Sequence, residues 1–394
     1  MRDYGHCAWL SKFQRQFWKM ASIFISTGEP SGHSYGAKIL RSLRNHISHL
    51  RAYSLFPNTT YPTNVTAVVR HSIPAAIGIS EAFKSIKSFF LSLMEVNRFF
   101  EKHSPDLALL IDFPEVNMRI ARLASRQNIP VVYFIPPQVW AWRPWRVQDL
   151  KKYTNCLIVI LPFEKTFYES KGINAVFLGH PVVDLINDEL SKSEPIEEYS
   201  NSIAVVPGSR KSELNHHVPL LKKVLYQLSS TWANTSIIVP APKGMENTFR
   251  RIFLSHEFSF CMDNLKVVSE NKYHVLQQCA GAIVASGTAT LELACLDVPM
   301  VVFYRVSRIS AAVGRLLIRA QFASLPNLIM GARLVPELLQ DDAEPDKILF
   351  FFTEVMKNEK LLEMQKRGFR QIRERLGRPG VFNRIAHYIM EFLK

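Results

Sequence analysis

Long apolar runs are missing from the sequence. The longest, such as CLIVILPF at residues 156–163, fall well short of the roughly 18 uninterrupted apolar residues that a membrane-spanning helix requires. Residues 1–20 lack the apolar middle and the small-residue cleavage site of a secretory signal. We therefore expect no membrane span, and we interpret residues 1–20 as a basic, aromatic extension. An interfacial helix, an unstructured leader and a start site assigned upstream of Met20 remain open for it.

Cysteine is scarce and scattered, without a CxxC pair or a histidine at metal-ligand spacing. This pattern is typical of reduced, structural thiols in a cytoplasmic protein. The five cysteines are Cys7, Cys156, Cys261, Cys279 and Cys295.

Acidic residues are outnumbered, 34 against 48 Lys and Arg, which gives a formal net charge of +14. Such an excess favours polyanionic partners, namely nucleic acid, anionic lipid or phosphorylated substrates. The basic residues are spread along the chain, without a basic tail or an RNA-binding signature. We therefore expect phosphorylated substrates or anionic lipid, and no nucleic acid.

Short apolar runs rich in β-branched residues alternate with helix-like stretches, which is typical of βα units and a parallel sheet. A polar, acid-rich segment interrupts them at 184–201, and 394 residues exceed what one core usually supports. We predict an α/β protein with two Rossmann-like domains. The strands are expected at 22–26, 107–111, 130–134, 156–160, 175–178, 202–206, 235–239, 264–268, 281–285 and 299–303. The expected parts are an extension (1–20), an N-terminal domain (21–185), a linker (186–201), a C-terminal domain (202–365) and helices packing across both domains (366–394).

Two loops of the N-terminal half carry candidate residues. The loop at 27–36 has glycines at Gly28, Gly32 and Gly36, which miss the GxGxxG spacing of dinucleotide sites. It places backbone near a substrate or serves chain geometry alone. Asp112 follows an apolar strand, where a carboxylate is suited to accept a proton from a sugar hydroxyl. A helix N-cap is the alternative for Asp112.

A Trp-rich stretch, PPQVWAWRPW at 136–145, follows the apolar run VVYFI. It should therefore lie at the carboxyl end of a strand, where open α/β sheets bind ligands.

Two loops of the C-terminal half suit phosphate groups. At 205–213, Ser209 and Arg210 enter a helix, so backbone amides and a guanidinium are expected to face phosphate oxygens. An N-cap role for Ser209 with a solvated Arg210 is the alternative. At 283–294 a strand ends before Ser286, and Glu292 lies one turn into the next helix. Amides and hydroxyls there suit a diphosphate and the carboxylate suits a ribose; capping alone is the alternative.

These and further segments, in this order, make the chain resemble the lipid-A-disaccharide synthase family, inverting glycosyltransferases of the GT-B class, whose two Rossmann-like domains face a central cleft. The matching segments are GEPSG (28–32), IDFPEVN (111–117), PPQVWAWR (136–143), LPFEKTFY (161–168), GHPVVD (179–184), PGSR (207–210), ASGTATLE (285–292), MVVFYRVS (300–307) and SLPNLI (324–329).

The resemblance implies UDP-2,3-diacylglucosamine as donor, 2,3-diacylglucosamine 1-phosphate (lipid X) as acceptor, and UDP as leaving group. It implies no metal and no other cofactor, and a homodimer is a family-level expectation. By carry-over Asp112 is the base, Arg210 a phosphate ligand and Asn327 an organising residue of the catalytic set. The residues expected to bind substrate or nucleotide are Gly28, Glu29, Ser31, Gly32, Gln138, Arg143, Gly208, Ser209, Ser286, Gly287, Thr288, Ala289, Thr290 and Glu292.

Some neighbouring positions carry weaker expectations. Glu164 and Lys165 are interpreted as part of the cleft wall or as an ion pair, and His180 as a structural histidine. The chain departs from the family pattern at His33, where an Asp is usual, and at Glu115, which lengthens the second acid of the DxPDF motif. These departures put acceptor binding in question.

The segment 73–94 is a candidate membrane contact, because its apolar residues can share one helix side while two lysines reach lipid headgroups. Its alternative is a core-packed helix. We hypothesise peripheral attachment to the cytoplasmic leaflet of the inner membrane. The residues concerned are Ile77, Phe83, Lys84, Ile86, Lys87, Phe89, Phe90 and Leu93.

Two other functions fit part of this pattern. Another UDP-hexosamine enzyme of the same fold, such as an epimerase, would share the nucleotide loop but would not need the aromatic, amphipathic surface. A non-catalytic basic binding protein would explain the charge but not why Asp112, Arg210 and Glu292 all follow strands.

Overall fold

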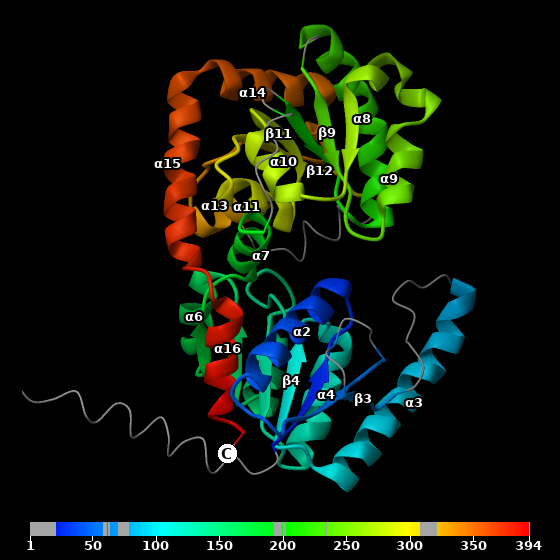
Figure 1. The fold of residues 1–394 in the computed structure, drawn as a ribbon, viewed down its shortest axis with the longest axis vertical. Coiled ribbons are helices and arrows are strands. Elements are labelled where there is room, and N and C mark those ends of the chain that lie inside the picture. The colour runs from blue at the N-terminus through cyan, green and yellow to red at the C-terminus, as the bar shows by residue number, and fades with distance from the viewer. Residues whose placement is uncertain are drawn as a thin grey trace, which may run out of the picture. The chain divides into compact units, whose positions relative to one another are not determined.

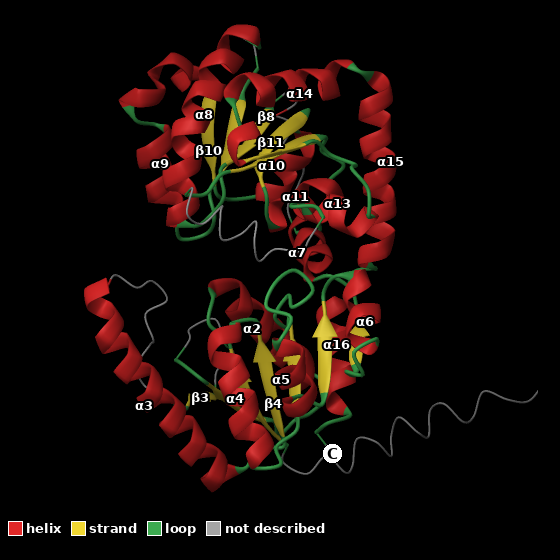
Figure 2. Cartoon of the chain, turned by 180° about the vertical axis from the view of Figure 1, so that it is seen from behind, coloured by secondary structure: helices red, strands yellow, loops and turns green. Residues whose placement is uncertain are grey.

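The computed structural model describes residues 21–57, 61, 64–69, 79–192, 199, 202–232, 235–307 and 321–393, with backbone only at 79–87 and 262–263. Its internal contacts divide the chain into two units. Unit 1 comprises Met1–Pro181 and Gly380–Lys394, and unit 2 comprises Val182–Pro379. In each unit a sheet is flanked by helices (Figures 1 and 2).

The sheet of unit 1 has seven parallel strands in the order β3-β2-β1-β4-β5-β6-β7. The central strands are apolar on both faces because helices cover both, as parallel sheets require. The strands are β1 (Ser22–Ser26), β2 (Arg51–Ser54), β3 (Val65–Ala67), β4 (Leu107–Ile111), β5 (Val131–Phe134), β6 (Cys156–Val159) and β7 (Ala175–Phe177).

The helices of unit 1 divide between the two faces of this sheet. One core joins Ile23, Ile25 and Leu109 to α2 and α16, which lie side by side (Figure 1). The opposite core joins Phe24 and Leu110 to α3, α4, α5 and α6. Alternate residues of one strand thus enter different cores. The helices are α2 (Pro30–Arg44), α3 (Ile79–His103), α4 (Pro114–Arg126), α5 (Arg146–Tyr153), α6 (Pro162–Glu169) and α16 (Val381–Met390).

The sheet of unit 2 has six parallel strands in the order β10-β9-β8-β11-β12-β13. They are β8 (Ile203–Val206), β9 (Ile237–Pro240), β10 (Leu265–Val268), β11 (Gly281–Ala285), β12 (Met300–Tyr304) and β13 (Glu337–Leu339). Helices α8, α9 and α14 pack on one core, and α11, α13 and α15 pack on one another. The helices are α7 (Pro181–Leu190), α8 (Lys211–Thr231), α9 (Glu246–Phe253), η2 (His256–Asn264), α10 (Lys272–Gln278), α11 (Thr288–Cys295), α13 (Leu325–Met330), η3 (Gln340–Asp342), α14 (Pro345–Lys357) and α15 (Glu359–Leu376).

Each sheet reverses its strand order at one point, between β1 and β4 in unit 1 and between β8 and β11 in unit 2. Open α/β sheets bind ligands at the carboxyl ends of the strands at such a switch point. All four loops that follow these strands carry residues that the sequence singled out. The predicted α/β class with two parallel, Rossmann-like sheets is confirmed.

The structure differs from the predicted boundaries in two places. The predicted linker at 186–201 begins inside α7, because the acid-rich stretch buries Val182 and Ile186 on one helix side. The predicted tail at 366–394 splits, since α15 packs within unit 2 while α16 packs against α2 in unit 1. Three short strands, β2, β3 and β13, were not predicted because each is only three or four residues long and partly exposed.

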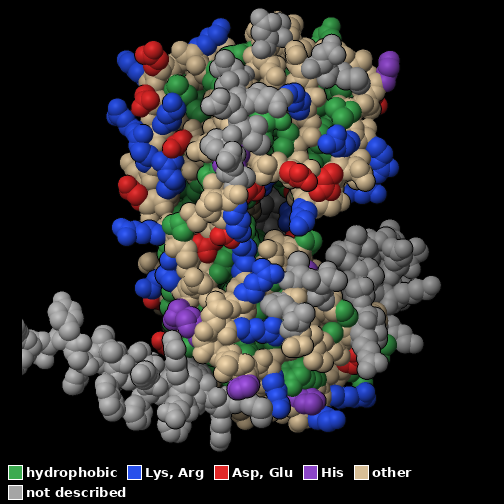
Figure 3. All heavy atoms as spheres, viewed as in Figure 1, with side chains coloured by type: hydrophobic (Ala, Val, Ile, Leu, Met, Phe, Trp, Pro, Cys, Tyr) green, Lys and Arg blue, Asp and Glu red, His purple; other side chains and the backbone are tan. Residues whose placement is uncertain are grey.

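Three further facts concern the surface charges, the thiols and the helices. Lys and Arg are scattered over both units on the face in Figure 3. Among the described residues, Cys156, Cys261, Cys279 and Cys295 form no disulfide. None of the described helices is long and apolar enough to cross a bilayer.

Candidate functional site

Asp112 lies directly after β4, at the switch point of unit 1. Its φ is 50° and that of Phe113 is 52°, so two successive non-glycine residues adopt the left-handed conformation. The cap of α4 is Phe113, and Pro114 begins the helix. The alternative that Asp112 caps the helix is therefore wrong. Its side chain is partly exposed at the sheet edge.

The loop after β1 lies beside Asp112, because β1 and β4 pair directly. A Cβ on Gly28 would overlap the ring of Phe113, so this glycine is required by packing. Gly32 is buried beside Thr27. For Gly28 this packing supports the chain-geometry interpretation, whereas a Cβ on Gly32 would meet Thr27 at an ordinary 3.5 Å. Glu29 and Ser31 are exposed, with Glu29 at the cap of α2.

His33, where the family usually has an acid, hydrogen-bonds through Nδ1 to the hydroxyl of Thr27 at 2.5 Å. That hydroxyl also contacts the Tyr61 hydroxyl at 3.0 Å. Burial lowers the pKa of His33, so the neutral imidazole is favoured. The substitution thus replaces an anion at this edge by a neutral hydrogen-bonding group.

The Trp-rich loop after β5 presents its three tryptophans differently. Trp140 is partly buried, stacks edge-on against Phe163 and donates its indole N–H to Glu164 at 2.9 Å. The Arg143 guanidinium lies 4.2 Å from the centre of the Trp142 ring, close enough for a cation–π contact. Trp145 is 63% exposed. Gln138 is exposed and its carbonyl accepts hydrogen bonds from two later loop amides.

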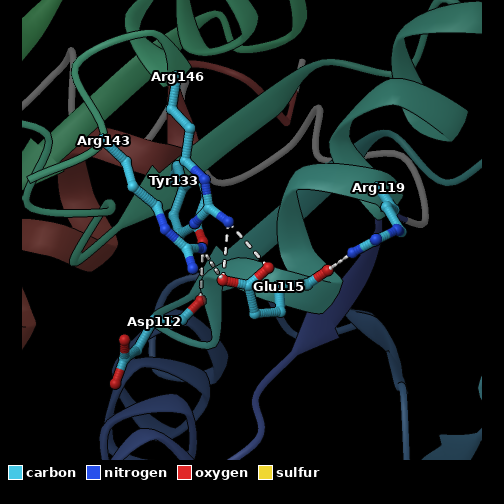
Figure 4. Close-up of polar contacts among 6 residues, drawn as sticks. All are labelled: Asp112, Glu115, Arg119, Tyr133, Arg143 and Arg146. Carbon is cyan, nitrogen blue, oxygen red and sulfur yellow. Dashed lines mark hydrogen bonds and ion pairs between the residues drawn. The ribbon is translucent and has the colours of Figure 1, made fainter. Parts of the chain in front are cut away.

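Glu115 joins this loop to α4 (Figure 4). Its carboxylate accepts from Arg143 at 2.6 Å and from Arg146 at 2.7 and 2.8 Å. Burial acts to raise the pKa of Glu115, but the two guanidinium groups outweigh it and the pKa is lowered. The lengthened acid of the family motif is therefore an ionised anchor for two arginines, of which Arg146 was not predicted.

Glu164 and Lys165 do not form the predicted ion pair. Glu164 is buried and accepts from the amides of Ile160 and Leu161, whereas Lys165 lies 3.7 Å from Glu169. Glu164 thus braces the Trp-rich loop from inside.

His180 is 3% exposed, and burial lowers its pKa to about 4. The interpretation of His180 as structural agrees with this burial.

The backbone amides of the loop after β8 already bind a side-chain carboxylate of this chain, that of Glu213. Glu213 Oε2 accepts from the amides of Ser209 at 3.1 Å and Arg210 at 3.2 Å. The prediction that these amides face phosphate is therefore wrong for this structure, and Ser209 is not the cap, since Arg210 is. The Arg210 side chain is 67% exposed and contacts Glu213 with one nitrogen at 3.3 Å, which leaves its other donors for a ligand. A Cβ on Gly208 would strike Glu213.

The loop after β11 separates the predicted nucleotide residues into two groups. Gly287 and Thr288 are exposed, and Ala289 follows them at the start of α11, where the first N–H groups have no partner within the helix. The side-chain hydroxyls of Ser286 and Thr290 instead donate to backbone carbonyls of this chain. The Ser286 hydroxyl donates to the Ala323 carbonyl at 2.7 Å, and the buried Thr290 hydroxyl donates to the Gly287 carbonyl at 2.7 Å.

Glu292 is held by two neighbours on α10. Lys272 Nζ lies 2.8 Å from Oε2, and the Tyr273 hydroxyl donates to Oε1 at 3.1 Å. A carboxylate has about four acceptor sites, so Glu292 keeps capacity for a ligand hydroxyl.

Asn327 is fully buried and uses both ends of its amide. Nδ2 donates to the Val335 carbonyl and to Glu337, and Oδ1 accepts from the amides of Leu334 and Val335. Glu337 in turn accepts from the amides of Ala323 and Ser324. Asn327 therefore organises the loop that holds Ser286, which agrees with the organising role expected for it, and its place in the catalytic set stays a prediction.

The family model for lipid-A-disaccharide synthetase matches residues 23–386 of the chain. The chain belongs to the lipid-A-disaccharide synthase family. The lipid-A-disaccharide synthase of Geobacter sulfurreducens is 31% identical over 376 residues, which cover 94% of this chain and 97% of that protein. That of Nitrosococcus oceani is 30% identical over 360 residues, covering 90% and 92%. As a member of this family the protein is a UDP-sugar-dependent glycosyltransferase of lipid A biosynthesis. The alternative function offered by the sequence, a non-catalytic basic binding protein, is therefore wrong.

Solved structures establish the GT-B fold. The UDP-GlcNAc 2-epimerase of Neisseria meningitidis, bound to UDP-GlcNAc, gives a TM-score of 0.64 at 12% identity, covering 94% of this chain and 100% of that one. MurG of Acinetobacter baumannii gives 0.57 at 12% identity, covering 95% and 100%. Likeness at this identity shows the fold alone, so the epimerase alternative has no support beyond it.

Sequence reasoning missed Asn117, Tyr133, Arg146 and Glu213. Asn117 ends the matched segment IDFPEVN and could have been singled out from that position. Tyr133 and Arg146 carry no sequence signal, because their partners come from other elements. Glu213 could have been found from its spacing, because it lies three and four residues after the amides that it binds, as an acid in the first turn of a helix often does.

Proposed function

We propose that the chain transfers 2,3-diacylglucosamine from its UDP donor to the 6-hydroxyl of lipid X. The anomeric carbon is inverted, and the products are the β-1,6 disaccharide 1-phosphate and UDP. The observation that carries the residue assignment is the position of Asp112 on the left-handed turn after the central strand of unit 1.

In this proposal the Asp112 carboxylate accepts the proton of the acceptor's 6-hydroxyl. The hydroxyl oxygen forms a bond to the anomeric carbon as the bond between that carbon and the diphosphate oxygen breaks. The electron pair of the breaking bond leaves with UDP. Figure 4 supports the role, because the Asp112 carboxylate points away from Glu115, Arg143 and Arg146.

Residues of unit 2 would stabilise the departing diphosphate. Arg210 supplies an exposed guanidinium, and Gly287 to Ala289 supply amides at the start of α11. Glu292, oriented by Lys272 and Tyr273, would accept a hydrogen bond from the ribose.

Residues of unit 1 would hold the acceptor. Arg143, oriented by Glu115 and by the Trp142 ring, suits the acceptor's 1-phosphate. Gln138, Glu29 and Ser31 are exposed at the same sheet edge and suit sugar hydroxyls.

Peripheral attachment to the cytoplasmic leaflet of the inner membrane is also proposed. Of the predicted segment 73–94, residues 73–78, which include Ile77, lie outside the described residues, and residues 79–87 are described in backbone only, which leaves the side chains of Phe83, Lys84, Ile86 and Lys87 undescribed. In the last part of this segment, which belongs to α3, the side chains of Phe90 (59% exposed), Leu91 and Met94 are exposed. Their exposure supports contact with acyl chains. If F90S/M94S left sedimentation with anionic vesicles unchanged, this attachment would be refuted.

A homodimer stays a family-level proposal, checked by sedimentation velocity.

The function is tested by UDP release from UDP-2,3-diacylglucosamine with and without lipid X. Asp112→Asn should lower acceptor-dependent release by roughly 10²- to 10⁴-fold, the usual worth of a general base. Asp149→Asn, an exposed carboxylate of unit 1 on α5, serves as the control and should retain the parent rate. Unchanged release from Asp112→Asn would remove Asp112 as the base. Conversion of unacylated UDP-GlcNAc without acceptor would instead favour the epimerase.

A further inference from the structure

The turn that carries Asp112 has an unfavourable backbone conformation. Asp112 and Phe113 both have φ near 50°, a backbone conformation that residues other than glycine rarely adopt. Such backbone persists only where the surrounding structure over-determines it, and it concentrates at functional sites.

Asn117 supplies the first restraint on this turn. It is fully buried on α4, and its Nδ2 donates to the Asp112 carbonyl at 2.6 Å. Nδ2 also lies 3.2 Å from the Ile111 carbonyl, and Oδ1 accepts from the Ser26 hydroxyl at 2.5 Å. One amide therefore ties the ends of β1 and β4 together at the switch point.

Tyr133 supplies the second restraint, from the neighbouring strand β5. It is fully buried, and its hydroxyl donates to the same Asp112 carbonyl at 2.9 Å (Figure 4). Burial raises the pKa of Tyr133, and the Asp112 charge raises it further. The phenol therefore stays protonated and keeps its role as donor.

The Asp112 carbonyl accepts two hydrogen bonds, one for each lone pair of its oxygen. The two donors come from different elements, α4 and β5, so both elements fix the position of this carbonyl. The Asp112 amide is fixed as well, since it donates to the Phe134 carbonyl at 3.0 Å. Both polar ends of the residue are thus held while its carboxylate points elsewhere (Figure 4).

We propose that Asn117 and Tyr133 are positioning residues for the base, fixing the Asp112 backbone so that its carboxylate is aimed at the acceptor hydroxyl. This inference rests on the proposed function of Asp112. It predicts that loosening either contact affects the chemical step rather than substrate binding, because misplacement of a reacting group by about 1 Å costs as much as 10²-fold in rate.

The main test is Tyr133→Phe, which keeps the ring and removes only the hydroxyl. It should lower kcat roughly tenfold while KM for donor and acceptor stays within about twofold of the parent value. Tyr388→Phe is the matched control, because its hydroxyl contacts Cys156 at the first residue of β6, at the opposite end of the strands from Asp112. It should keep the parent kcat. A parent kcat for Tyr133→Phe, or an equal loss in the control, would overturn the proposal.

Asn117→Ser keeps the proposal testable if Tyr133→Phe does not fold. The shorter side chain cannot reach the Asp112 carbonyl, so kcat should fall by roughly 100-fold with both KM values nearly unchanged.

A double variant separates positioning from general loss of structure. In the Asp112→Ala background, Tyr133→Phe should not lower the residual rate further, because no base remains to be positioned. A further loss there would show a structural role and overturn the proposal. Activity retained by Asp112→Ala alone would instead refute the proposed function, so the two failures are distinguishable.

Discussion

The indole N–H of Trp140 donates to Oε1 of Glu164 at 2.9 Å. This contact ties the Trp-rich loop at 136–145 to the first turn of α6. Because Glu164 also accepts from the amides of Ile160 and Leu161, its buried carboxylate is satisfied by three donors. The loop that carries Arg143 is therefore braced by a residue that does not face substrate.

Replacing this carboxylate should destabilise unit 1. Glu164→Gln places an amide NH₂ against N–H donors, so we expect the free energy of unfolding to fall by about 1–3 kcal/mol, measured by urea denaturation at pH 8. Glu169→Gln, whose exposed carboxylate lies 3.7 Å from Lys165, should change it by less than about 0.5 kcal/mol. Equal effects of the two changes would contradict the bracing role.

Gly28 and Phe113 should be coupled, because a Cβ on Gly28 overlaps the Phe113 ring. Gly28→Ala should cost about 1–3 kcal/mol by overpacking and should lower kcat, since the ring adjoins Asp112. Gly32→Ala is the control, because its Cβ would meet Thr27 at an ordinary 3.5 Å.

The double variant decides whether packing is the cause. Gly28→Ala with Phe113→Leu should be less destabilised than the sum of the two single changes, because the smaller side chain gives room to the new methyl group. Strict additivity in urea denaturation would show that the Phe113 ring is not the obstacle.

Arg143 should govern affinity for the acceptor. Arg143→Ala should raise KM for lipid X by roughly 10- to 100-fold, since a charge-assisted hydrogen bond contributes about 1.5–3 kcal/mol, and KM for the donor should stay constant. The exposed Arg126, at the last turn of α4, offers the control Arg126→Ala. A rise in donor KM alone would place Arg143 elsewhere.

His180 should make stability depend on pH. Burial lowers its pKa to about 4 in the folded protein, whereas an unperturbed histidine has a pKa of about 6.5. Between these values the unfolded chain binds a proton that the folded chain does not, so the free energy of unfolding falls as pH drops from about 6.5 to 4. The full loss is about 3 kcal/mol at 1.36 kcal/mol per pKa unit.

This dependence is measured by urea denaturation at several pH values. His180→Gln should flatten the curve between pH 6.5 and 4, whereas the exposed His49→Gln should leave its slope as in the parent. A curve for His180→Gln as steep as the parent's would exclude His180 as its source.

The ten predicted strands all form, because β-branched apolar runs such as LALLI at 107–111 can be buried on both faces only in a covered parallel sheet. The strands that were missed are short and lie toward the sheet edges, where one or both faces stay partly wet. The position of Asp112 after a central strand was likewise predictable, since it needs only strand order in the chain.

The partners of the site residues were not predictable in the same way. Glu213 accepts hydrogen bonds from the amides of Ser209 and Arg210, and the Ser286 hydroxyl donates to the Ala323 carbonyl. Motif spacing identified these groups as phosphate binders, but it does not reveal which nearby acceptor competes for them.

By itself the sequence determined the α/β class, the two parallel sheets and the four loops that carry the candidate site, because alternating apolar runs and strand-end residues express local periodicity. Only the tertiary structure decided which side chains of those loops are available and which are held. Asn117, Tyr133 and Asp112 come from three elements, and their contact exists only because the sheet places the ends of β1, β4 and β5 next to one another.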